Sequence, residues 1–111
     1  MKVNTRKIGK VSVVDLGGKI TIGEGDVVLR DTVQELLDSG NQHILLNLEK
    51  VSYMDSAGIG ELVACYKRAR EKAGNVKLLN PSGKVYDLLS LTKLEEVFET
   101  FKDEREALVS F

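Results

Sequence analysis

The stretch that most constrains the fold is Met-Asp-Ser-Ala-Gly-Ile-Gly at residues 54–60, where an apolar run meets the most regular helical pattern in the chain. The run before it, Ile-Leu-Leu-Asn-Leu at 44–48, is typical of a strand buried on both faces, so we expect a strand over 43–48. After the stretch, apolar residues recur at helical spacing, which places them on one face of a helix over about 57–73. These apolar residues are Ile59, Leu62, Val63, Tyr66 and Ala69.

The first turn of this helix carries two features that need a physical reason. Ser56 stands where a helix N-cap is expected, because its hydroxyl can accept a hydrogen bond from a free backbone N–H group one turn further on. Gly58 and Gly60 are poor helix formers, each costing about 1 kcal/mol relative to alanine. Without side chains they would let another backbone or a partner approach closely. We therefore expect that replacing Gly58 with leucine weakens partner binding more than it weakens folding.

The rest of the chain alternates strand and helix patterns. From residue 43 onward this alternation predicts parallel pairing with right-handed crossovers, and an opening hairpin adds antiparallel strands. We therefore expect an α/β fold, a small mixed β-sheet flanked by about four helices. The expected elements are strands over 3–8, 11–16, 76–79 and 97–101, a short continuation over 19–22, a loop over 23–26, and helices over about 27–38, 83–90 and 103–110. Gly40 and Gly74 are expected to end their helices in the left-handed conformation.

Length and charge limit what kind of protein this is. The chain has 111 residues and is expected to form one domain over residues 1–111. Its net charge of −1 argues against a broad electrostatic footprint for nucleic acid. No apolar run approaches the roughly 20 residues that cross a bilayer, so we expect no membrane insertion. The single cysteine fits a reducing compartment, and we expect a cytoplasmic protein.

Residues that could perform catalysis are too few to form an active site. His43 is the only histidine and starts a strand, where a solvated or hydrogen-bonded role is expected. Cys65 lies on the flank of the apolar helix face, and free cysteine is commonly buried. A lone histidine and a lone cysteine do not form a metal site. We therefore expect no enzyme activity, no metal and no cofactor.

Residues 53–60, Tyr-Met-Asp-Ser-Ala-Gly-Ile-Gly, closely resemble the signature of the STAS domain, in particular that of bacterial anti-sigma factor antagonists. The resemblance extends from about Val11 to the C-terminus but is sharp only in this segment. Gly18 and residues 87–92 match more loosely. The chain departs from the family where antagonists usually carry an acidic residue shortly after the early glycine. Thr21 stands there instead, with acidic residues later, at Glu24 and Asp26; Lys93 also replaces a frequent glycine.

This resemblance implies a phosphorylation site and a partner surface. The serine directly after the aspartate is the family's phosphorylated residue, which corresponds to Ser56. The resemblance implies that partners bind at Asp55, Ser56, Ala57, Gly58, Ile59 and Gly60. The unphosphorylated form would bind an anti-sigma factor, which in this family is a serine kinase with an ATP-binding fold, and would thereby release a sigma factor. A metal-dependent serine phosphatase would reverse the modification.

Two other functions fit parts of the same pattern. One is a STAS subunit of a lipid-transport or signalling assembly that is never phosphorylated. In that protein Ser56 would be a plain helix cap and the same surface a constitutive interface. The other is a small-molecule or nucleotide-binding module that uses the crevice at the strand ends.

Overall fold

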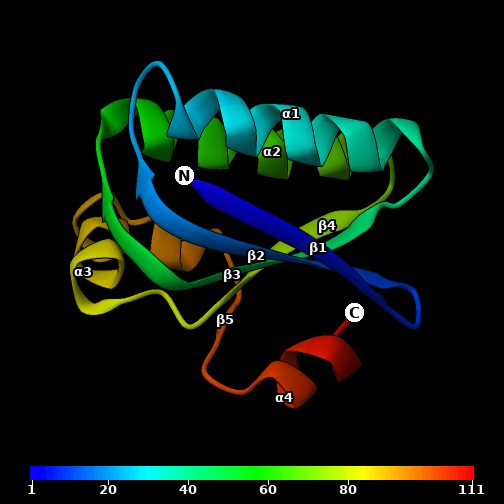
Figure 1. Cartoon of the computed structure of the whole chain (residues 1–111). Coiled ribbons are helices and arrows are strands. Elements are labelled where there is room, and N and C mark those ends of the chain that lie inside the picture. The colour runs from blue at the N-terminus through cyan, green and yellow to red at the C-terminus, as the bar shows by residue number, and fades with distance from the viewer.

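A five-stranded mixed sheet forms the centre of the molecule, and the computed structural model describes all residues, 1–111 (Figure 1). The strand order is β1-β2-β3-β4-β5, with β1 antiparallel to β2 and all other neighbours parallel. The strands are β1 (Lys2–Ile8), β2 (Val11–Ile20), β3 (His43–Met54), β4 (Asn75–Leu79) and β5 (Thr100–Phe101). The expected mixed α/β fold is therefore confirmed.

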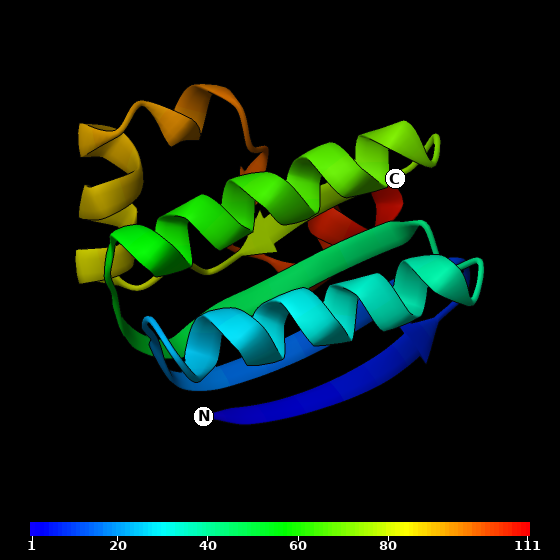
Figure 2. The same cartoon turned by 90° about the horizontal axis from the view of Figure 1, so that it is seen from above.

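Helices cover the two faces of the sheet unequally. The long helices α1 and α2 lie side by side over one face, and α4 packs against the other (Figures 1 and 2). The short helix α3 follows β4 and lies beside the end of β3. Their bounds are α1 (Gly25–Asp38), α2 (Ser56–Glu71), α3 (Gly83–Leu91) and α4 (Glu104–Val109), with a 3-10 turn at Leu94–Glu96. None of the helices combines the length and the hydropathy that crossing a bilayer requires.

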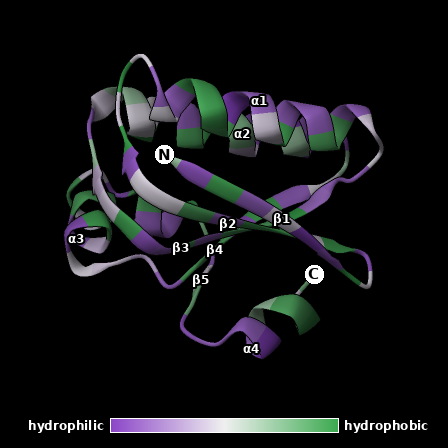
Figure 3. Cartoon of the chain, viewed as in Figure 1, coloured by the Kyte–Doolittle hydropathy of each residue, from purple (hydrophilic) through white to green (hydrophobic).

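The unbroken apolar run of β3 follows from this two-sided cover. Side chains alternate along a strand, so Ile44 and Leu46 enter the core beneath α1 and α2, while Leu45 enters the cluster beneath α4. All three side chains are fully buried. Apolar residues accordingly occur both on the helices above the sheet and on α4 below it (Figure 3).

The α4 side of the sheet also contains polar anchors. The buried Lys77 amine donates hydrogen bonds to the carbonyl oxygen of Ser110 (2.8 Å) and to its hydroxyl oxygen (2.9 Å). Arg6 of β1 pairs with Asp15 of β2 (2.7 Å) and with Glu104 of α4 (2.6 Å). These contacts fix the C-terminal helix to the face of the sheet that α1 and α2 leave open.

Several elements differ in extent from the prediction. The strand expected to stop at residue 48 continues to Met54, because Val51 and Met54 are again buried and pair with the end of β2. The helix expected from residue 27 starts at Gly25. The strand expected over 97–101 is wrong for its first half: Phe98 leaves the sheet plane and packs edge-on against Tyr66, with ring centroids 5.1 Å apart.

The end of α2 also differs from the prediction, although Gly40 is left-handed as expected, with φ +84°. Ala73, not Gly74, takes the left-handed conformation after α2, with φ 59°. Gly74 is required for another reason: a Cβ added there would overlap the carbonyl oxygen of Gln42. The glycine therefore allows the backbone to pass close to the segment that leads into β3.

This arrangement predicts opposite effects for two neighbouring substitutions. Ala73→Gly should raise the free energy of unfolding by about 1 kcal/mol, because glycine adopts positive φ without steric cost. Gly74→Ala should lower it by about 1–3 kcal/mol through the clash with Gln42. Urea denaturation of both variants and the wild type measures the two changes, and equal midpoints for the two variants would contradict this account.

Candidate functional site

The site lies at one end of the sheet, where β2 and β3 end and α1 and α2 begin (Figure 2). Residues 21–24 form the turn that joins β2 to α1, whereas Asp55 alone joins β3 to the first turn of α2, and these two connections lie next to each other. The end of β2 pairs with the end of β3, Ile20 opposite Met54. Ser56, the expected phosphorylation site, begins α2 two residues after β3 ends.

The side chain of Asp55 links the turn before α1 to the first turn of α2. One carboxylate oxygen, Oδ2, accepts a hydrogen bond from the backbone N–H of Ile22 in the turn before α1 (2.9 Å). The other, Oδ1, accepts from the N–H of Gly58 in the first turn of α2 (2.9 Å). The bond from Ile22 and then that from Gly58 hold the pKa of Asp55 below its ordinary value. Asp55 is therefore a negatively charged clamp between the start of α2 and a turn that is distant in sequence.

The expected N-cap role of Ser56 is wrong, because Asp55 occupies that position. Ser56 is instead the first residue of α2, and its side chain is exposed. Its hydroxyl has no hydrogen-bond partner in the protein. It is thus accessible to a partner, and its modification would break no internal bond.

Of the two roles expected for Gly58, the close approach of another backbone is confirmed, and an open backbone facing a partner is wrong. Gly58 is buried, and a Cβ added there would overlap the carbonyl oxygen of Ile20. Gly25, at the start of α1, is packed equally closely against the backbone of Lys19 and Ile20. Both glycines are therefore needed so that the two helices can start against the end of β2. Of the two glycines in the first turn of α2, only Gly60 is exposed, with open space where its Cβ would be.

A hollow of about 440 Å³ opens beside Ser56. Its lining includes Asp55 and Ser56, which the sequence predicted as site residues. It also includes Leu88 of α3 and the C-cap Thr92, which the sequence did not predict as site residues. The lining residues are Tyr53, Met54, Asp55, Ser56, Ile59, Leu88 and Thr92. The many apolar residues of α3 could have indicated its part in the site. A helix of nine residues cannot bury all of them on one side, so some remain at the surface.

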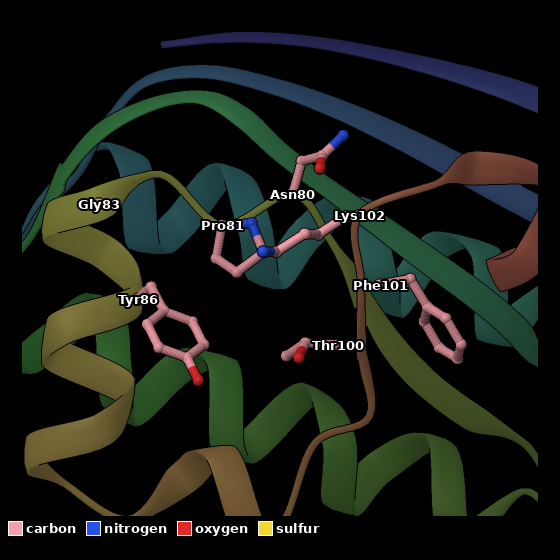
Figure 4. A pocket seen from close by; sticks show the side chains of 7 residues that line it. All are labelled: Asn80, Pro81, Gly83, Tyr86, Thr100, Phe101 and Lys102. Atoms are coloured by element: carbon pink, nitrogen blue, oxygen red, sulfur yellow. The ribbon is translucent and has the colours of Figure 1, made fainter.

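A separate hollow, of about 500 Å³, lies at the carboxyl ends of β4 and β5 (Figure 4). Ser56 and Asp55 do not line it. Its lining residues are Asn80, Pro81, Gly83, Tyr86, Thr100, Phe101 and Lys102. This is the strand-end crevice that a small-molecule module would use, and it is separate from the sequence signature.

The side chains with catalytic potential are not assembled near Ser56. Cys65 is fully buried, as expected, and burial raises the pKa of its thiol to about 12, so it stays protonated at neutral pH. His43 lies at the opposite end of β3, with its ring edge-on to Phe111 (6.0 Å between centroids). Ser56 therefore has neither a histidine nor a thiolate beside it, and its hydroxyl is not activated as a nucleophile.

The sequence and the fold both have clear relatives. The STAS domain model matches residues 2–107. The anti-sigma-B factor antagonist of Bacillus subtilis (strain 168) is 31% identical over 86 residues, which are 78% of this chain and 77% of that protein. A crystal structure of an anti-sigma factor antagonist candidate from Thermotoga maritima has a TM-score of 0.90 at 26% identity, covering 97% of this chain and 92% of that one.

A further solved structure shares the fold at lower identity. The Bacillus cell fate determinant SpoIIAA in its phosphorylated form has a TM-score of 0.76 at 22% identity, and the match covers 98% of each chain.

The glycine geometry predicts that Gly58 and Gly60 respond differently to the same change. Gly58→Ala should lower the free energy of unfolding by about 1–3 kcal/mol, because its methyl group meets the backbone of Ile20. Gly60→Ala should raise it by up to about 1 kcal/mol through helix propensity alone. Denaturant titration of both variants provides the test. Equal destabilisation of the two variants would show that close packing is not what requires Gly58.

The Asp55 clamp predicts a pH-dependent contribution to stability. Since the folded-state pKa lies below the ordinary 3.8, the carboxylate stabilises the fold above that pH, and this contribution is lost as pH falls through the lower value. Asp55→Asn places an NH2 group against one of the two backbone N–H donors, because these donors bond to different carboxylate oxygens, so its melting temperature should be lower at pH 7. The gap to the wild type should close as pH falls below about 4. A gap that stays constant with pH would contradict the clamp.

Proposed function

Because this chain belongs to the STAS domain family and, within it, to the anti-sigma factor antagonists, we propose that it is a protein-binding switch controlled at Ser56. Members of this group are regulatory proteins and not enzymes. The unphosphorylated chain, one STAS domain over residues 1–111, binds an anti-sigma factor in the cytoplasm and so releases a sigma factor. The observation that carries the proposal is the exposed, unbonded hydroxyl of Ser56 at the start of α2.

The anti-sigma factor is also the kinase that modifies Ser56. Its ATP-binding domain transfers a phosphoryl group to the Ser56 hydroxyl, which requires an accessible acceptor with no competing internal bond. A metal-dependent serine phosphatase later removes the phosphate and restores binding. The same exposure that admits the kinase leaves the phosphate open to this second enzyme.

The fold can accept a phosphate at this position. A phosphoserine carries about −1.5 to −2 charge at pH 7, and a helix N-terminus favours negative charge. Asp55, not Ser56, makes the bonds that hold the two turns together, so modification leaves them in place. SpoIIAA, which shares this fold, has been solved in a phosphorylated form.

The partner is affected more strongly than the fold. A phosphate on Ser56 would stand beside the Asp55 carboxylate, so two negative groups would meet any surface placed on them. An unpaired charge buried in an interface costs several kcal/mol. Steric exclusion and like-charge repulsion therefore act on the complex and not on the free chain.

The alternative function is a STAS subunit that binds its partner constitutively in a lipid-transport or signalling assembly. In that protein no kinase would act on Ser56, and the exposed hydroxyl would have no role. Phosphorylation by a cognate kinase separates the two functions directly.

We expect Ser56→Ala to abolish phosphorylation while keeping partner binding. The variant should unfold within about 0.5 kcal/mol of the wild type, because the Ser56 hydroxyl makes no internal bond. The assay is incubation with the cognate kinase and ATP, followed by mass-spectrometric mapping. Ser52 and Ser82 act as internal controls, since their hydroxyls donate to backbone carbonyl oxygens at 3.4 and 2.7 Å. Transfer to the alanine variant at the wild-type rate would refute the site.

A further inference from the structure

Helix α3 leaves part of its apolar surface unpacked. Val85 and Leu89 are buried in the core, 1% and 0% exposed. Leu88 and Leu91, three residues apart, lie on another side of the helix. Leu91 is 81% exposed, more than any other large hydrophobic side chain in the chain. The fold therefore gives no reason for a leucine at this position.

Leu88 lies where two hollows meet. The first is the hollow of about 440 Å³ that contains Ser56. The second, of about 260 Å³, runs along α3 and contains Leu91 but not Ser56. Both are lined by Tyr53, Met54 and Leu88, so the two hollows adjoin along these residues, between the start of α2 and α3.

We propose that the docking surface for the anti-sigma factor extends from Ser56 through both hollows. Its apolar anchors are Tyr53 at the end of β3 and Leu88 and Leu91 on α3, which together we call the α3 shoulder. This surface rests on the function proposed above, because its occupant is the same kinase partner. A kinase that reaches the Ser56 hydroxyl must enter the first hollow, and it then covers Leu88. The second hollow continues directly from that contact.

The chemistry of the α3 shoulder defines what the partner presents to it. The Thr92 hydroxyl donates to the carbonyl oxygen of Leu88 (2.8 Å), so it is satisfied within α3. The Tyr53 side chain is 48% exposed. Charged groups stand at the rim, where Lys84 and Asp87 line the second hollow. An apolar centre with a polar rim fits a partner element whose aliphatic or aromatic side chains fill the two hollows.

The position of Leu91 separates docking from phosphoryl transfer. Leu91 lines only the second hollow, so replacing it leaves Ser56, Asp55 and the first turn of α2 unchanged. A weaker anchor there should raise the KM for phosphorylation of Ser56 and leave kcat unchanged.

The test compares Leu91→Ser with Val109→Ser. Val109 is a matched control, since it is 77% exposed but lies on α4, on the opposite face of the sheet. Both substitutions remove an exposed aliphatic side chain, so both variants should keep the wild-type melting temperature. Each protein is titrated with the cognate anti-sigma factor kinase and radiolabelled ATP, and KM and kcat are measured.

We expect Leu91→Ser to raise KM about five- to tenfold with kcat within twofold, and Val109→Ser to match the wild type. A KM for Leu91→Ser equal to that of Val109→Ser would overturn the extension onto α3, while phosphorylation of Ser56 in all three proteins would keep the switch. No transfer to any of the three proteins would instead refute the proposed function, and the docking surface with it.

Discussion

The two hydrogen bonds accepted by the Asp55 carboxylate are the interaction on which the site depends. They tie the backbone of Ile22, in the turn before α1, to that of Gly58, in the first turn of α2. Ile22 and Asp55 are 33 residues apart in sequence, so a local helix cap also serves as a tertiary contact. Packing reinforces this contact, since Gly25 and Gly58 allow both helices to start against the end of β2.

This arrangement separates Asp55, which holds the site together, from Ser56, which we propose is phosphorylated. Asp55 makes the structural bonds, whereas the neighbouring Ser56 is exposed and makes none. A phosphate on Ser56 would therefore leave the sheet and the helices undisturbed. The same phosphate would change the charge of the surface beside Ser56, where the hollow extends onto Leu88 of α3. We therefore expect stability and partner binding to respond to different atoms of adjacent residues.

Periodicity in the sequence predicted the elements that local patterns control. The apolar runs predicted β3 and α2, and the helix expected over about 103–110 is α4, which Asp103 caps and which buries Ala107. Local patterns could not decide between Asp55 and Ser56 as the cap, because both are good caps and the choice depends on the distant N–H of Ile22. The burial of Gly58 depends on the position of Ile20, and the exposure of Leu91 on how α3 is oriented. These properties arise from tertiary packing.

The central claim is that charge on Ser56 controls the interface while the fold is preserved. Calorimetric titration of the cognate anti-sigma factor with chain phosphorylated only on Ser56, beside the unphosphorylated chain, tests this claim directly. We expect phosphorylation to weaken binding of the anti-sigma factor at least a hundredfold, equivalent to about 2.7 kcal/mol, and to leave the melting temperature of the chain unchanged. Equal affinity of the two forms would contradict the claim and would favour a constitutive interface.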